Sequence, residues 1–80
     1  MDTDLLRRIT IIPGLMGGRT TIRGMRFPVA DILGYLAAGM TEIELFENFP
    51  FIKKEDVNAA LLYAFEKINH PVIKVNYNAA

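Results

Sequence analysis

The sequence predicts a mainly α-helical domain with a short N-terminal β-hairpin, three helices and a short extended C-terminal tail. Residues 8–12 and 19–23 are rich in β-branched side chains and flank a turn-forming PGLMGG segment. Apolar residues recur at helical spacing from Val29 onwards, and a capping-box pattern begins at Thr41. Three helices joined by tight turns have the outline of a helix-turn-helix.

The β-rich segments predict a hairpin over about residues 8–23, because turn-forming residues separate two short runs of strand-forming residues. Two strands alone are barely stable in water, so the hairpin is expected to lie on the helices or to pair with another chain. The tail segment VIKVNY, residues 72–77, alternates like a short strand. It is expected to pair with the hairpin or with a second subunit.

The first helix is expected over about residues 28–38, because Val29, Ile32, Leu33 and Leu36 share one helical face. A proline suits the first helical turn, since its missing N–H would have no partner there. Pro28 is therefore expected inside that turn, and Gly39 is expected to end the helix in the left-handed conformation.

The second helix is expected over about residues 42–48, where local signals are strongest. Thr41 can cap the helix while Glu44 reaches back to the N–H of the capping residue, and Met40 with Leu45 would form a hydrophobic staple. Pro50 ends the segment.

The third helix is expected over about residues 54–68, with acidic residues in its first turn. Its apolar side chains cover more than one stripe, which suggests burial on two sides. A partner or dimer interface is therefore expected from this helix and the tail, at Leu62, Tyr63, Phe65, Val75 and Tyr77. Leu62→Glu or Phe65→Glu is expected to convert such a dimer to a monomer, because a buried unpaired carboxylate is costly.

Length and composition predict one domain over residues 1–80, with no internal repeat or linker. The sequence has no cysteine, its N-terminus lacks the basic-then-apolar order of a secretory signal, and its apolar runs are too short to cross a bilayer. A cytoplasmic location without membrane contact is therefore expected.

The residue types argue against catalysis. Serine and cysteine are absent, and His70 has no second histidine with which to bind a metal. The acid pairs Glu42/Glu44 and Glu55/Asp56 lie at expected helix starts, where capping is the simpler role. The PGLMGG segment lacks Walker-loop spacing and is more simply a tight turn than an anion nest. We therefore expect no enzymatic activity, metal, cofactor or small-molecule substrate.

Basic residues raise the alternative of DNA binding, although the net charge is zero. A basic stripe along the second strand and its exit could contact phosphates, or could equally be a solvated strand face. The third helix carries polar residues suited to base reading, but its acids oppose it. The candidate DNA-contacting residues are Arg19, Arg23, Arg26, Lys53, Lys54 and Asn58. Arg23→Ala or Arg26→Ala is expected to weaken DNA binding with little loss of thermal stability.

Residues 8–64 resemble the bacterial domain-of-unknown-function family 433 (DUF433). The motifs that carry the resemblance are Pro13-Gly14, Gly18, residues 22–29, residues 39–44, Phe49-Pro50, Glu55-Asp56 and residues 61–64. The turn, cap and helix-stop positions in these motifs are Gly18, Gly24, Pro28, Gly39, Thr41, Glu44 and Pro50. One departure is Lys53, where family members often carry a serine or threonine cap, and the loss of such a cap costs about 1 kcal/mol.

The resemblance implies a homeodomain-like trihelical fold and a VapB-like antitoxin role. Such an antitoxin would bind a PIN-like ribonuclease toxin and, as a homodimer, operator DNA. The alternative is a protein-interaction or dimerisation module that does not bind DNA, which the acidic helix start and the zero net charge favour.

Overall fold

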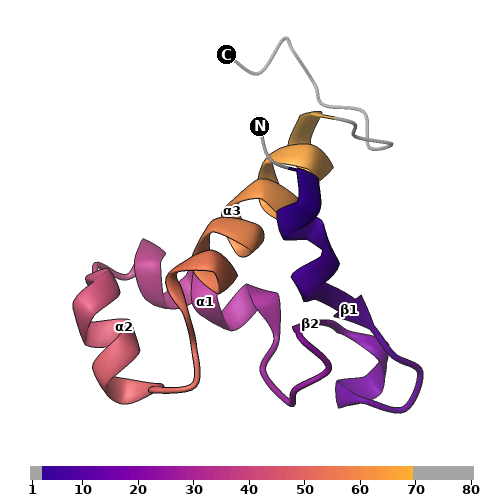
Figure 1. Cartoon of the computed structure of the whole chain (residues 1–80), viewed down its shortest axis with the longest axis horizontal. Coiled ribbons are helices and arrows are strands. Elements are labelled where there is room, and N and C mark those ends of the chain that lie inside the picture. The colour runs from indigo at the N-terminus through magenta and orange to yellow at the C-terminus, as the bar shows by residue number, and fades with distance from the viewer. Residues whose placement is uncertain (1–2, 70–80) are drawn as a thin grey trace, which may run out of the picture.

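The computed structural model describes residues 3–69, which form a mostly helical chain with a two-stranded antiparallel hairpin near the N-terminus (Figure 1). The expected tail strand, residues 72–77, lies outside the described residues. In chain order the elements are the 3-10 helix η1 (Thr3–Arg8), β1 (Ile9–Ile11), the 3-10 helix η2 (Met16–Gly18), β2 (Thr20–Ile22), α1 (Val29–Ala37), α2 (Glu42–Asn48) and α3 (Lys54–Asn69). The three α-helices begin and end within one residue of their predicted bounds.

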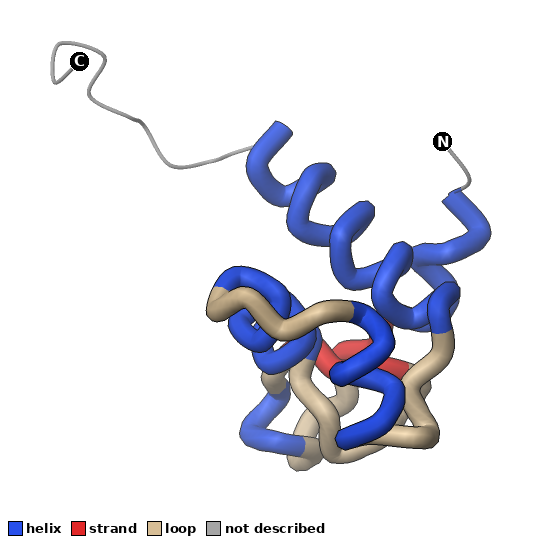
Figure 2. The backbone as a smooth tube through the Cα atoms, turned by 90° about the vertical axis from the view of Figure 1, so that its left-hand side faces the viewer, coloured by secondary structure: helices blue, strands red, loops and turns tan. Residues whose placement is uncertain are grey.

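The hairpin pairs β1 with β2 in a register that opposes Thr10 to Thr21. The two hydroxyl oxygens lie 2.8 Å apart, so each strand satisfies a polar side chain of the other. Ile22 is fully buried, and the hairpin lies against the helices rather than standing alone (Figure 2). Packing against the helices stabilises the hairpin, because two short strands alone are barely stable in water.

The 3-10 helix η1, which precedes the hairpin, was not predicted from the sequence. It lies alongside α3, and the two segments run in opposite directions (Figures 1 and 2). Short 3-10 segments lack strong sequence signals, and this one is stabilised by contacts with residues far away in the chain. Its presence gives α3 an intramolecular neighbour on a second side.

The ends of α1 differ in how well the sequence predicted them. Pro28 lies outside the helix as its N-cap residue, with φ −66° and ψ 143°, so its expected place in the first helical turn is wrong. Its extended backbone instead forms a bridge with Thr21 of β2. At the other end, Gly39 has φ +101°, and the N–H of Met40 donates to the carbonyl of Tyr35. This is a Schellman end that needs a residue tolerant of positive φ, so the prediction for Gly39 is confirmed.

The predicted capping box at the start of α2 is confirmed. The Glu44 N–H donates to the Thr41 hydroxyl over 3.1 Å, and the Thr41 N–H donates to the Glu44 carboxylate over 3.0 Å. These hydrogen bonds, first the one from the Thr41 backbone, hold the pKa of Glu44 below its ordinary value. Leu45 is fully buried, and Met40 packs against the same core.

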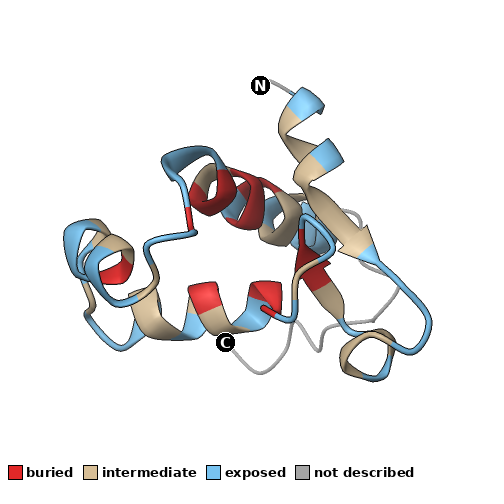
Figure 3. Cartoon of the chain, turned by 60° about the horizontal axis from the view of Figure 1, so that its bottom comes forward, coloured by how far each residue is buried: buried red, intermediate tan, exposed pale blue. Residues whose placement is uncertain are grey.

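The core lies where α1, α2, α3 and β2 converge (Figure 3). Edge-to-face contacts extend it beneath the α2–α3 turn, where the ring centroids of Phe27 and Phe49 lie 4.9 Å apart. The buried cluster consists of Ile22, Phe27, Val29, Ile32, Leu45, Ile52, Val57 and Ala60. No helix in residues 3–69 has both the length and the apolar character needed to cross a membrane.

Candidate protein-binding surface of the third helix

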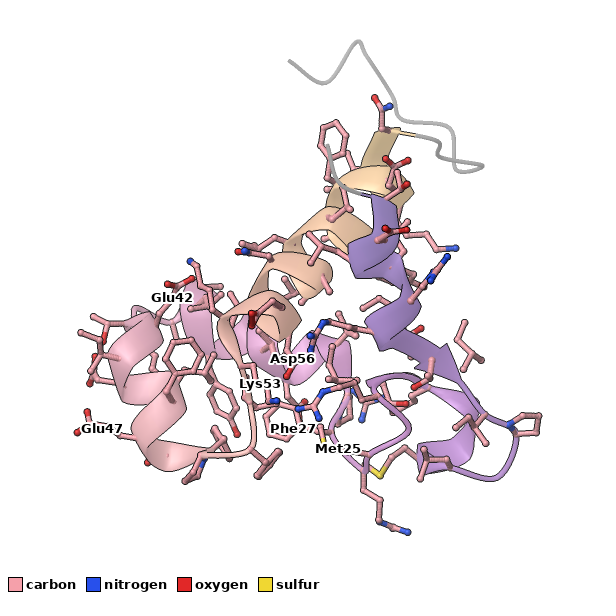
Figure 4. The ribbon with its side chains drawn as sticks, viewed as in Figure 1. Met25, Phe27, Glu42, Glu47, Lys53 and Asp56 are labelled. Atoms are coloured by element: carbon pink, nitrogen blue, oxygen red, sulfur yellow. The ribbon has the colours of Figure 1, made fainter. Side chains whose placement is uncertain are left out.

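A buried carboxylate at the start of α3 joins three segments of the chain. The Asp56 side chain has no exposed surface, and Figure 4 shows it between α3 and the N-terminal segment. Arg23 donates to both of its oxygens, over 3.0 and 2.8 Å, and Arg8 donates over 2.9 Å. The Lys53 N–H also donates to it over 2.9 Å, so Asp56 caps the helix whose usual capping hydroxyl is missing.

Arg23 is held by hydrogen bonds within the protein and is not a free surface cation. Its Nη2 also donates to the Phe51 carbonyl over 2.6 Å, and its backbone takes the left-handed conformation with φ +48°. The guanidinium is therefore occupied by the protein itself. The expectation that Arg23 belongs to a free basic stripe is wrong, because the turn after β2 directs its side chain towards α3.

The electrostatics of the cluster favour the charged forms. Burial alone would raise the pKa of Asp56, but the hydrogen bonds from Arg23, from the Lys53 amide and from Arg8 outweigh it and lower the pKa. The hydrogen bond to Asp56 likewise raises the pKa of Arg23. A protonated Asp56 would lose most of these interactions while remaining buried.

Acid is therefore expected to weaken the fold through Asp56. A carboxyl group whose pKa is lower in the folded state stabilises the protein above its unfolded pKa, near 4, and this contribution disappears as the pH falls towards the lower folded value. Urea denaturation of the wild type and of Asp56→Asn would be measured between neutral pH and about pH 3. The free energy of unfolding should fall more steeply with decreasing pH in the wild type than in Asp56→Asn. Parallel pH profiles for the two proteins would contradict this assignment.

The structure does not bring the other proposed DNA-contacting residues together. The Lys54 ammonium lies 2.7 and 2.8 Å from the two carboxylate oxygens of Glu42, so α2 neutralises it. Lys53 is exposed and Asn58 is half-buried on α3, whereas Arg26 is exposed in the turn after β2. Arg19 lines a separate groove farther along α3. The six residues therefore do not form one basic surface.

The proposed interface residues also separate. Leu62 is only 5% exposed within the single chain, so its expected place on a free interface is wrong. Tyr63 is partly buried, and its hydroxyl lies 3.2 Å from the Thr20 hydroxyl. Phe65 is 45% exposed and could contact a partner, whereas Val75 and Tyr77 lie outside the described residues.

An exposed apolar stripe lies beside Phe65 on α3, and its other two members were not among the interface residues expected from the sequence. Leu61 is 47% exposed and Ile68 is 77% exposed. Together with Phe65 they occupy positions i, i+4 and i+7, which share one face of a helix. Their helical spacing was visible in the sequence, but only the packing of η1, α1 and β1 against α3 shows which apolar stripe is left exposed.

An open groove of about 460 Å³ continues from this stripe between β2, α1 and α3. Its lining is mostly apolar, and the charged members that the structure describes are Arg19 and Lys67. The Lys67 ammonium lies 5.6 Å from the centre of the Tyr63 ring. The remaining lining residues are Thr20, Val29, Ala30, Leu33, Ala64 and Ile68.

The described residues contain no grouping of three histidine, cysteine, aspartate or glutamate side chains that could hold a metal ion. The buried Asp56 is fully engaged by two guanidinium groups and a backbone amide, so it is no free acid or base. His70 lies outside the described residues. The exposed surface features described above for residues 3–69 are the stripe and the groove.

Comparison with known proteins places this arrangement in a family. The chain is 34% identical over 56 residues to the uncharacterized protein y4eO of Sinorhizobium fredii. The matched segment covers 70% of this chain but only 25% of that protein. It is also similar to the crystal structure of a DUF433 member from Anabaena variabilis, with a TM-score of 0.73 and 34% identity over 84% of this chain and 66% of that one. Residues 9–64 match the family described as protein of unknown function, DUF433. The chain therefore belongs to the DUF433 family.

Proposed function

We propose that the chain is a non-catalytic, cytoplasmic antitoxin-like protein that binds a PIN-like ribonuclease toxin through α3. The observation that carries this proposal is the exposed apolar stripe of Leu61, Phe65 and Ile68 on α3. Contiguous apolar surface of this kind is typical of protein-binding sites when a groove continues it. The identity of the partner class rests on the family resemblance.

The ends of α3 differ in a way that supports protein binding more than DNA binding. Its N-terminal turn carries Asp56, which is buried, and Lys54, which is paired with Glu42. Its C-terminal half carries the exposed apolar stripe. In the proposed homeodomain-like helix-turn-helix, α3 would be the recognition helix, and DNA contact would rest on Lys53 and Asn58 beside the acidic Glu55. Operator binding is therefore the less supported part of the antitoxin role.

A dimerisation module is the second candidate, and the spacing of the stripe favours it. Side chains at i, i+4 and i+7 can pack against the same face of a second copy, as they do along a helix pair. A dimer formed in this way would bury Phe65 and Ile68 against their counterparts. The two candidates use the same surface but predict different stoichiometries.

Phe65→Glu is expected to abolish or strongly weaken the complex with the toxin. The wild-type chain would be co-expressed with the protein encoded by the adjacent gene, and the mass of the eluted species would be measured by light scattering. Truncation of a central interface aromatic commonly costs more than about 2 kcal/mol, and a buried unpaired carboxylate adds to that loss. Ile43→Glu is the matched control, because Ile43 is 71% exposed on α2, away from the stripe.

A mixed complex that loses its ribonuclease inhibition in Phe65→Glu but not in Ile43→Glu would support the antitoxin role. If the wild-type chain elutes alone as a dimer and Phe65→Glu makes it monomeric, the dimerisation module is correct. A stable mixed complex that tolerates Phe65→Glu would contradict the assignment of the stripe.

A further inference from the structure

The groove between β2, α1 and α3 has a charge pattern that limits what can fill it. Among the described residues, its lining contains two cations, Arg19 and Lys67, and no carboxylate. Neither cation forms an ion pair with any residue in the 3–69 range. The polar hydroxyls that line it, those of Thr20 and Tyr63, already lie within hydrogen-bonding distance of each other. Within the described part of the chain, the groove therefore offers apolar surface and positive charge without an acidic partner.

The shape of the groove favours a chain segment over a small molecule. Its volume of about 460 Å³ would also suit a small molecule, but the groove is open to solvent instead of enclosed. Ile68 belongs both to the groove and to the exposed stripe with Leu61 and Phe65. The apolar surface is therefore elongated, which suits an amphipathic helix lying along α3.

We propose that this groove binds an apolar helical segment of the partner protein, and that Arg19 and Lys67 pair with a carboxylate carried by that segment. This inference deepens the proposed function and rests on it for the identity of the partner. Cations flanking an apolar groove select an acidic segment and reject a basic one, because like charges brought together there are repelled. The groove would thus determine which partner segment is bound, while the stripe of Leu61, Phe65 and Ile68 supplies additional apolar contact.

The first test uses a probe that does not depend on the toxin. Two synthetic amphipathic helical peptides would share one leucine face and differ only in flanking glutamates or lysines, and each would be titrated into the isotopically labelled full-length chain. We expect the glutamate peptide to shift the amide signals of Thr20, Ala30 and Lys67 and to bind at least about 10-fold more tightly. Equal binding of both peptides, or shifts confined to other parts of the chain, would overturn the proposal.

The second test blocks the groove in the complex with the toxin. Ala30 is exposed on α1 and lines the groove, so Ala30→Trp should fill it without disturbing the core. Ala37→Trp is the matched control, because Ala37 is exposed on the same helix and does not line the groove. We expect Ala30→Trp to weaken toxin binding by at least about 10-fold and the control to leave it unchanged.

A charge-reversal test distinguishes a specific role of Arg19 and Lys67 from a general effect of the net charge of the protein. Arg19→Glu with Lys67→Glu should weaken the complex at low salt by at least about 10-fold, whereas Arg26→Glu, at an exposed arginine outside the groove, should not. If the toxin binds all these variants as it binds the wild type, the groove inference fails while the proposed function stands. If no toxin is bound but the glutamate peptide occupies the groove, the proposed function fails while the groove inference stands.

Discussion

Replacing Asp56 with alanine is expected to lower the free energy of unfolding by about 3 kcal/mol or more. Asp56 is fully buried and accepts hydrogen bonds from Arg23, Arg8 and the Lys53 amide. Its removal leaves two guanidinium groups without their counterion and an amide without its acceptor. Because both arginines are about one-third exposed, water can compensate part of this loss, which places the effect at the lower end for a buried ion pair.

Urea denaturation at neutral pH would measure the effect as a fall in the midpoint at unchanged slope. Glu55→Ala is the matched control, since Glu55 is the exposed neighbour of Asp56 in the first turn of the same helix. We expect it to change the unfolding free energy by less than about 0.5 kcal/mol. A small effect of Asp56→Ala, similar to that of Glu55→Ala, would show that the cluster contributes little to stability.

Arg23→Ala is expected to lower the free energy of unfolding by about 2 kcal/mol, which reverses the expectation from sequence alone. The substitution removes a two-point contact with Asp56 and the hydrogen bond to the Phe51 carbonyl. It also leaves the buried carboxylate with Arg8 as its one remaining charged partner in residues 3–69. Charge-assisted hydrogen bonds of this kind are individually stronger than neutral ones.

Arg26→Ala provides the comparison, because Arg26 lies exposed three residues further along the same turn. Its substitution should change stability by less than about 0.5 kcal/mol. The double variant Arg23→Ala/Asp56→Ala should be less destabilised than the sum of the single variants, because each single change already breaks the shared contact. Strict additivity would refute direct coupling between the two side chains.

The helix boundaries could be predicted because their signals are local. Thr41 and Glu44 are three residues apart, and Gly39 adopts a conformation that few other residue types tolerate. Such signals depend on neighbouring residues and not on the rest of the fold. Pro28 shows the limit of this reasoning, because a residue suited to a first helical turn is equally suited to the extended position before it.

The side-chain assignments depended on contacts that are far apart in sequence. Arg23 and Asp56 are separated by 33 positions and Arg8 and Asp56 by 48, so neither pairing leaves a recognisable spacing. From the sequence alone, Asp56 was expected to be one of two acids favoured by the helix dipole. Its different role follows only from the path of η1 and the turn after β2.

The third helix was predicted correctly in one respect and incompletely in another. The apolar residues around most of its circumference predicted burial on two sides. The second side is covered along part of its length by η1 of the same chain. Leu62 is buried within the single chain, while Leu61 beside it remains half-exposed. Neighbouring leucines cannot be distinguished from sequence when the covering segment itself is not predicted.

The contacts of Asp56 also make the N-terminal segment part of the cooperative folding unit. Fraying of η1 would withdraw Arg8 from a carboxylate that also anchors the turn after β2 and the first turn of α3. Local opening at the start of the chain is therefore thermodynamically linked to loosening of the helix that carries the binding surface. Conversely, a partner that holds α3 in place would reduce opening of η1 by the same linkage, so binding on α3 would also protect the N-terminal segment packed beside it.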